Sequence, residues 1–247
     1  MTALEEMLNR YKEPSSPTEQ DKQDRAERMV RDGVAAWSGF NGVSIRYLPK
    51  GSYKNNTNVK ADSDVDIAVI DTDLYYYDTS LLTPADQAAI SGGGVASASP
   101  LQGMRLRTEL EKALTAKFGS ACDTSGKTAI TITENSGRVS ADAVPSFPFW
   151  LYYYDALGRV THVEGTKTFR KDGSQVVNYP EQQYTNGVAK NQATGRRYKF
   201  LVRILKRLEN DLVKAGKLTE LPSYFMECLV YCVPNSQFGH RTDTADG

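Results

Sequence analysis

Two carboxylates stand two residues apart at the start of an apolar run. Asp64 and Asp66 flank Val65, and residues 67–70 read Ile-Ala-Val-Ile, which is typical of a buried strand. In a strand, side chains at positions i and i+2 project from the same face, so the two carboxylates are expected to point together. Two such charges repel each other unless a cation lies between them. The spacing therefore predicts a site for a hard divalent ion such as Mg²⁺, which prefers oxygen ligands.

A Gly-Ser pair upstream and a third aspartate downstream extend this interpretation. Gly51 and Ser52 precede Asp64 by eleven residues; glycine lets backbone approach a phosphate closely, and serine offers a hydroxyl and an N–H group. Asp142 alternates with two alanines in a later strand and is the candidate third ligand of a two-metal site, with ions ~3.5–4 Å apart. An Asp-x-Asp pair alone is more often a solvated strand end. The upstream Gly-Ser pair favours the catalytic interpretation.

The composition is that of an ordinary globular protein. The 247 residues are 40% apolar and 24% charged, with a formal net charge of zero, which fits one large domain or two small lobes. A neutral chain has no overall field to recruit nucleic acid or an anionic membrane, so any anion site must be local. No apolar run approaches membrane-spanning length and the N-terminus lacks a leader pattern. We expect a soluble, cytoplasmic protein.

The cysteine count argues against a disulfide framework or a zinc site. Three cysteines, an odd number, are expected to be reduced and buried thiols. Cys228 and Cys232 are four residues apart and would share a helix face, but only His162 and His240 could join them as soft ligands.

Periodicity and turn signals predict an α+β fold with a helical C-terminal portion. The capping pattern of Ser16, Pro17 and Glu19 predicts a long helix that ends near Trp37. Pro145 is expected to end a strand, and 91–100 is expected to be a surface loop. Predicted helices span 3–11, 16–37, 101–118, 196–215 and 222–233; predicted strands span 43–48, 64–70, 128–133 and 138–144, with hairpins turning at 155–158 and 171–173. In the helix over 196–215 the expected inner face is Phe200, Leu201, Ile204, Leu205, Leu208 and Leu212.

The ordered set of motifs resembles a known enzyme family. Gly-Ser followed by Asp-x-Asp is similar to the signature of the DNA polymerase β-like nucleotidyltransferases. The wider pattern GSYxxxTxVxxxSDVDIAV at 51–69 resembles the CD-NTases. These are the cyclic-oligonucleotide synthases of bacterial anti-phage (CBASS) systems and are related to animal cyclic GMP–AMP synthase. Three further stretches are similar to that family: 14–20, 141–145 and 198–231.

The resemblance implies a polymerase β-like core, a mixed sheet with flanking helices, in residues 1–180. A helical lobe would follow in 181–247, with the active site in the cleft between the two. Gly51 and Ser52 would bind the donor triphosphate. Asn56 stands before Thr57 where the family often has glycine. The remaining implied roles are metal binding by Asp64, Asp66 and Asp142, contact with terminal phosphates by Lys206 and Ser223, and base stacking by Tyr224.

Structural alternatives stand beside two of these roles. Lys206 lies among other cations and is also explained as a solvated helix flank. For Tyr224, core packing is slightly favoured over base stacking. The consecutive tyrosines at 75–77 are expected to pack or to anchor a loop rather than to bind bases.

The implied reaction is condensation of NTPs, ATP among them, into a cyclic di- or oligonucleotide with release of pyrophosphate. Two Mg²⁺ ions, with Mn²⁺ as a substitute, would serve as cofactors. Candidate partners are effector or regulatory proteins of the same defence system, with no membrane and no sequence-specific nucleic acid. Two alternatives remain open. One is a nucleotidyltransferase acting on a protein, tRNA or small-molecule acceptor, and the other is an inactive nucleotide-binding sensor.

Overall fold

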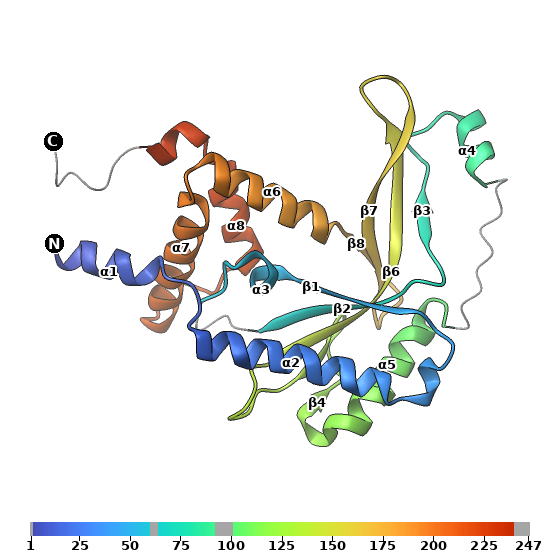
Figure 1. Ribbon diagram of the computed structural model, residues 1–247, viewed down its shortest axis with the longest axis horizontal. Coiled ribbons are helices and arrows are strands. Elements are labelled where there is room, and N and C mark those ends of the chain that lie inside the picture. Colours follow the sequence, from blue (N-terminus) through green and yellow to red (C-terminus); the bar gives the residue numbers. More distant parts are fainter. Residues whose placement is uncertain (1, 60–63, 92–100, 240–247) are drawn as a thin grey trace. The chain divides into compact units, whose positions relative to one another are not determined.

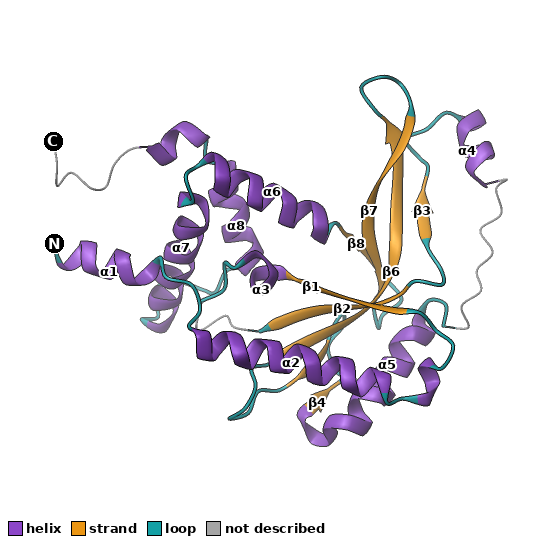
Figure 2. Cartoon of the chain, in the orientation of Figure 1, coloured by secondary structure: helices purple, strands orange, loops and turns teal. Residues whose placement is uncertain are grey.

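The computed structural model describes residues 2–59, 64–91 and 101–239. These residues form two compact units, drawn in Figure 1 and Figure 2. The unit that we call the sheet unit comprises Asp24–Lys50 and Val65–Glu181. What we call the helical unit comprises the described residues of Met1–Gln23, Gly51–Asp64 and Gln182–Gly247. Most of the expected loop over 91–100 lies outside the described residues.

The central sheet of the sheet unit has the strand order β1-β2-β6-β5-β4. β1 (Ile45–Lys50) pairs antiparallel with β2 (Val65–Asp71), and β2 pairs parallel with β6 (Ala141–Tyr154). On the other side of β6 follow β5 (Ile130–Ile132) and β4 (Cys122–Asp123), both antiparallel to their neighbours. The predicted strands over 64–70 and 128–133 are therefore confirmed, and β2 is an inner strand beside the central β6.

β6 does not end at Pro145 as the sequence suggested, but continues to Tyr154. Its first half pairs with β2 and β5, and its second half pairs with β3 (Tyr76–Asp78) and β7 (Val160–Phe169). Pro145 falls between the last β6 residue that pairs with β5 and the first that pairs with β7. A proline ring is tolerated there because the strand has no ladder partner on that side. The predicted hairpins are confirmed, the second leading into β8 (Gln175–Asn178).

Two helices supply much of the core around this sheet. α2 (Pro17–Ala35) begins with the predicted capping box, in which Glu19 N donates to Ser16 Oγ at 3.3 Å and Ser16 N donates to Glu19 Oε2 at 2.9 Å. Near its end, Trp37 Nε1 donates to Glu109 of α5 (Met104–Phe118) at 2.9 Å. The apolar stripe of α5 is fully buried, as its spacing predicted. The buried side chains of the two helices are Ala26, Val30, Val34, Leu106, Leu110 and Leu114.

The described part of the helical unit consists of helices that lie far apart in the sequence. Pro180–Ala193 forms α6, whose first two residues belong to the sheet unit. The two predicted C-terminal helices are confirmed as α7 (Arg197–Lys214) and α8 (Ser223–Cys232). The remaining helices of the structure are α1 (Ala3–Tyr11), α3 (Gly51–Asn55), α4 (Pro84–Ser91) and the short 3₁₀ helices η1 (Ser38–Phe40), η2 (Gly119–Ala121) and η3 (Asn235–Gly239).

The predicted inner face of α7 is wrong. Leu201 and Leu212, expected inside, are 41% and 43% exposed. The residues that α7 buries are instead Tyr198, Val202, Arg203, Lys206 and Glu209. Three of these carry charge, and burial of a charge is tolerated when partners satisfy it. The helix is therefore turned so that three charged groups share its interior face with Tyr198 and Val202, and of the predicted leucines Leu205 packs against that apolar cluster.

Neither a membrane helix nor a cysteine cluster is present in the described ranges. No helix there combines the length and the apolar character needed to cross a bilayer. All three cysteines are free, as predicted, but none of them is buried: Cys122 and Cys228 are half-buried and Cys232 is exposed, so the predicted burial of the thiols was wrong. Cys232 is the last residue of α8, where the helix end leaves its side chain accessible.

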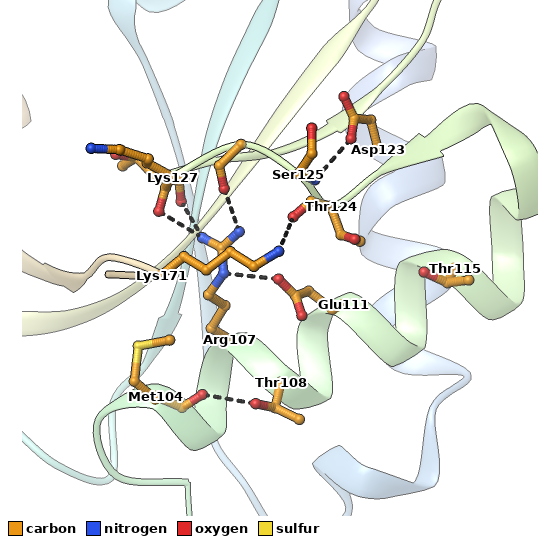
Figure 3. Close-up of polar contacts among 12 residues, drawn as sticks. Met104, Arg107, Thr108, Glu111, Thr115, Asp123, Thr124, Ser125, Lys127 and Lys171 are labelled. Atoms are coloured by element: carbon orange, nitrogen blue, oxygen red, sulfur yellow. Dashed lines mark hydrogen bonds and ion pairs between the residues drawn. The ribbon is translucent and has the colours of Figure 1, made fainter. Parts of the chain in front are cut away.

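A buried arginine of α5 is hydrogen-bonded to the loop between β4 and β5 (Figure 3). Arg107 is 2% exposed, and its guanidinium donates to the carbonyl oxygens of Gly126, Lys127 and Thr128 at 2.7–3.2 Å. Its Nε also donates to Glu111 at 2.8 Å. The planar guanidinium group thus supplies hydrogen-bond donors to three loop carbonyl oxygens, which would otherwise lack them.

We expect Arg107→Ala to lower the free energy of unfolding by about 3 kcal/mol, because three buried carbonyls lose their donor. Urea denaturation followed by circular dichroism measures this change. Arg159→Ala is the control, since Arg159 pairs with Asp155 in an exposed turn and should leave the midpoint unchanged. Equal midpoints for the two variants would contradict the role given to Arg107.

Candidate active site

The parallel pairing of β2 with β6 sets Asp66 beside Asp142. The two residues are direct partners in the strand register. Residues aligned on neighbouring strands ~4.8 Å apart place their side chains on the same face of the sheet. Asp66 is the one residue of β2 that is not buried; it is half-buried, and so is Asp142 on β6. One face of a buried sheet thus presents two adjacent carboxylates, 76 positions apart in the sequence.

Thr131 on β5 completes this row and was missed from the sequence. It is the register partner of Asp142, and its Oγ1 donates to Asp142 Oδ1 at 2.6 Å. The bond fixes the rotation of the Asp142 carboxylate. The alternation of threonine with apolar residues in 128–133 was the available signal, because it places Thr131 on the face opposite to Ile130 and Ile132.

Asp64 lies immediately before β2 rather than within it, and its side chain is exposed. The strand begins at Val65, whose N–H donates to the Ser140 carbonyl at 3.0 Å. Across residues 2–59, 64–91 and 101–239, no three His, Cys, Asp or Glu side chains gather closely enough to form a metal site by themselves. A carboxylate pair nevertheless fits Mg²⁺, which commonly takes one or two carboxylates and completes its shell with phosphate and water oxygens.

The Gly-Ser pair opens α3 in the helical unit. Gly51 has φ of +67°, a conformation that glycine adopts without strain as the chain passes from β1 into α3. The helix closes where Thr57 N donates to the Ser52 carbonyl at 3.0 Å. Asn56 occupies the position before Thr57 at which glycine is frequent in the family that the sequence resembles. Its φ of +52° shows that the backbone there is left-handed, as it would be for glycine. Asparagine is among the few other residues that tolerate this conformation.

Lys206 is buried in an ion pair, so its interpretation as a solvated flank is wrong. It is 1% exposed, and Nζ lies 2.9 Å from Oε1 of Glu227 on α8. Glu227, itself 4% exposed, also accepts from Thr57 Oγ1 at 2.7 Å and from Asn55 Nδ2 at 3.3 Å. Sequence reasoning missed Glu227, because a single acid within an apolar helix has no spacing signal.

Ser223 and Tyr224 form the start of α8. Tyr224 is 52% exposed, which excludes the core-packing interpretation. Partial burial, followed by a hydrogen bond to the Cys228 thiol, raises the pKa of Tyr224 to about 12, so the phenol stays neutral near pH 7. Its ring lines a pocket of the helical unit with about 410 Å³ of empty space including the open mouth. The other lining residues are Asn55, Gln183, Asn186, Gly187, Tyr198, Glu227, Cys228 and Tyr231.

The tyrosines at 75–77 pack in the sheet unit, as predicted. Tyr75 stacks on Trp150 with ring centroids 4.1 Å apart, and His162 stacks on the same indole at 4.6 Å. Tyr76 meets Phe147 edge to face at 5.3 Å. These contacts account for the run of aromatic residues by cross-strand packing.

Comparison with known proteins agrees with this geometry. Residues 185–246 match the cGAS/DncV-like nucleotidyltransferase C-terminal helical domain. The chain is 40% identical over 236 residues to the cyclic dipyrimidine nucleotide synthase CdnE of Legionella pneumophila, covering 95% of this chain and 78% of that protein. It is 36% identical over 248 residues to a cyclic dipurine nucleotide synthase of Elizabethkingia meningoseptica, covering 99% and 82%.

A solved structure gives the same result for the fold. The Rhodothermus marinus CdnE c-UMP-AMP synthase with Apcpp and Upnpp matches with a TM-score of 0.77 at 29% identity, covering 95% of this chain and 77% of that one. A mixed sheet carrying paired aspartates, with a helical C-terminal portion, defines a polymerase β-like nucleotidyltransferase. The chain belongs to the cGAS/DncV-like nucleotidyltransferases, the CD-NTases, and is an enzyme of that class. The predicted family and fold class are confirmed.

The left-handed residue after α3 generates a stability prediction. Asn56→Gly should keep or slightly raise the free energy of unfolding, whereas Asn56→Val should lower it by about 1–2 kcal/mol, because a β-branched residue is strained at positive φ. Asn41→Val is the matched control, since Asn41 is exposed with φ of −61°. Urea titrations of the three variants test this, and a harmless Asn56→Val would contradict the assigned backbone conformation.

Proposed function

We propose that this enzyme joins two nucleoside triphosphates into a cyclic dinucleotide with release of pyrophosphate, as a signal in anti-phage defence. The observation that carries the proposal is the register of Asp66 with Asp142 on neighbouring parallel strands. The functions of its relatives, cyclic dipyrimidine and cyclic dipurine nucleotide synthesis, support a cyclic dinucleotide as the product class. Larger rings remain within the same chemistry.

Asp64, Asp66 and Asp142 are the residues that would hold two divalent cations, Mg²⁺ or Mn²⁺ in its place. Bound there, such ions would supply charge neutralisation at the triphosphate and lower the pKa of the attacking hydroxyl. The all-oxygen donor set suits hard cations. The hydrogen bond from Thr131 to Asp142 Oδ1 would hold that carboxylate in one orientation while its other oxygen stays on the substrate side.

The protein's own groups bind and orient the nucleotides. We assign Gly51 and Ser52 to the donor triphosphate, Lys206 and Ser223 to its terminal phosphates, and Tyr224 to stacking on a base. A ribose hydroxyl of one nucleotide attacks the α-phosphorus of the other, the new P–O bond forms as the bond to the pyrophosphate oxygen breaks, and Asp142 accepts the hydroxyl proton. A second transfer with the linear intermediate turned around closes the ring.

The half-exposed ring of Tyr224 beside a pocket supports a base-stacking role. Amide groups of Asn55, Gln183 and Asn186 line the same pocket and could donate to or accept from a base edge. We further propose that the transfer chemistry belongs to residues 1–180 and that 181–247 act as a helical nucleotide-binding lobe. The enzyme would act in the cytoplasm, with NTPs as substrates and effector or regulatory proteins of its defence system as partners.

We expect Asp64→Ala combined with Asp66→Ala to reduce divalent-ion-dependent NTP turnover by more than about a thousandfold. Circular dichroism should stay unchanged, because both positions are accessible and a small side chain leaves no core cavity. Asp21→Ala with Asp24→Ala, two exposed acids on α2, is the matched control and should retain full activity. EDTA should abolish wild-type turnover and Mg²⁺ restore it. Full product formation by the first double variant would refute the proposal.

Product analysis separates this function from its alternatives. Incubation with each α-³²P-labelled NTP and Mg²⁺, followed by phosphatase treatment and mass spectrometry, should reveal a phosphatase-resistant small product. Label on an added protein, tRNA or small-molecule acceptor would instead indicate an acceptor-modifying nucleotidyltransferase. Absence of any turnover would favour a nucleotide sensor.

A further inference from the structure

One buried carboxylate joins the parts of the helical unit to which the proposed function assigns phosphate binding. Glu227 Oε1 accepts from Lys206 Nζ at 2.9 Å and from Thr57 Oγ1 at 2.7 Å, and Oε2 accepts from Asn55 Nδ2 at 3.3 Å. Asn55 is the last residue of α3, which starts with Gly51 and Ser52, and Thr57 follows two residues later. Glu227 lies one turn after Ser223 on α8.

The residues of this hydrogen-bonded group are buried, so the loss of any one contact is costly. Glu227 and Lys206 are 4% and 1% exposed, and Thr57 is fully buried. A buried charge is tolerated only when partners satisfy it, and loss of one partner leaves the others uncompensated.

A second buried charge holds the same segment. Arg203, one turn before Lys206 on α7, donates from Nη1 to the Asn56 carbonyl at 2.7 Å and from Nε to the Lys12 carbonyl at 2.6 Å. Thr57 N in turn donates to the Ser52 carbonyl. The end of α3 is thus fixed by its backbone to α7 and by its side chains to α8, and Glu227 is the group that also reaches Lys206.

We propose that Glu227 is a positioning residue for triphosphate binding. It holds Lys206 and the Gly51–Asn55 helix in one arrangement, so that only a local opening at the buried Lys206 is needed for both to contact the same triphosphate. The inference rests on the proposed function, which assigns phosphate contacts to these groups. Glu227 acts through Lys206 and Thr57.

A purely structural role for Glu227 is the competing explanation, and the chain provides a matched control. Glu209 on α7 is also 4% exposed and belongs to the same unit. Its Oε1 accepts from the backbone N–H of Leu221 at 2.9 Å, in the connection between α7 and α8. Glu209→Ala therefore removes an equally buried carboxylate that holds none of the groups assigned to phosphate.

The experiment is calorimetric titration of the full chain with tripolyphosphate in excess Mg²⁺, a probe without a base. We expect Glu227→Ala to weaken binding about tenfold or more and Glu227→Gln, which keeps the shape but loses the charge, by about threefold. Glu209→Ala should stay within about twofold of wild type. Thr57→Val, which deletes one hydroxyl at constant shape, should weaken binding on its own but have little further effect in Glu227→Ala, because both remove the same contact.

Kinetics give a second readout. In Glu227→Gln, KM for the NTP turned over fastest should rise while kcat changes less than about threefold, since binding rather than the chemical step is affected. The proposal would be overturned if Glu227→Ala and Glu209→Ala bound tripolyphosphate with equal affinity. It would also be overturned if the wild-type protein did not bind tripolyphosphate. If Glu227→Ala does not fold, unchanged affinity in both Thr57→Val and Glu227→Gln overturns it. Lack of a cyclic product with intact tripolyphosphate binding would instead refute the proposed function.

Discussion

The register between β2 and β6 is the constraint on which the acidic part of the site depends. Because side chains alternate along a strand, a slip of one residue would turn Asp66 into the core and bring Val65 or Ile67 to the accessible face. The apolar neighbours prevent that slip, since five of the seven residues of β2 are buried and apolar, and such positions tolerate no charge without partners. The hydrophobic core thus sets the position of the two carboxylates as a consequence of its own packing.

The helical unit uses a different principle. Its ordering contacts are polar and buried: Glu227 with Lys206 and Thr57, and Arg203 with two backbone carbonyls. Burial strengthens each of these hydrogen bonds, and it also raises the free-energy penalty when a polar group in the network loses its partner. Such a network tolerates few intermediate arrangements, which suits a unit that has to present fixed donors to a highly charged ligand. Several leucines of the same helices remain exposed as a result.

Sequence patterns were informative wherever spacing alone determines structure. The capping residues of α2, the stripe of α5 and the hairpins after β6 all follow from local rules. The rotation of α7 could not be predicted in this way, because an apolar stripe is normally taken as the inner face and the partners of its charges lie on distant segments. Pro145 was misleading for the same reason, since its tolerance depends on which strands pair beside it.

The candidate site was predictable to a similar extent. Asp64, Asp66 and Asp142 were predicted from spacing, together with Gly51 and Ser52, whereas the roles of Lys206, Ser223 and Tyr224 came from the resemblance to the family and remain predictions. Thr131 and Glu227 were missed, because each matters through a hydrogen bond to a residue distant in sequence. Asn56 retains a glycine-like backbone that only coordinates reveal. Local chemistry is readable from sequence, whereas the groups that orient it become visible only with the fold.

The two tryptophans have a practical consequence for studying the molecule. The chain contains only Trp37 and Trp150, and both belong to the sheet unit. Trp37 is hydrogen-bonded to Glu109, and Trp150 is stacked between Tyr75 and His162. Indole fluorescence, excited at wavelengths where tyrosine does not absorb, therefore reports on the sheet unit alone. Compared with the circular dichroism of the whole chain, this signal separates unfolding of the sheet unit from unfolding of the helical unit without any added label.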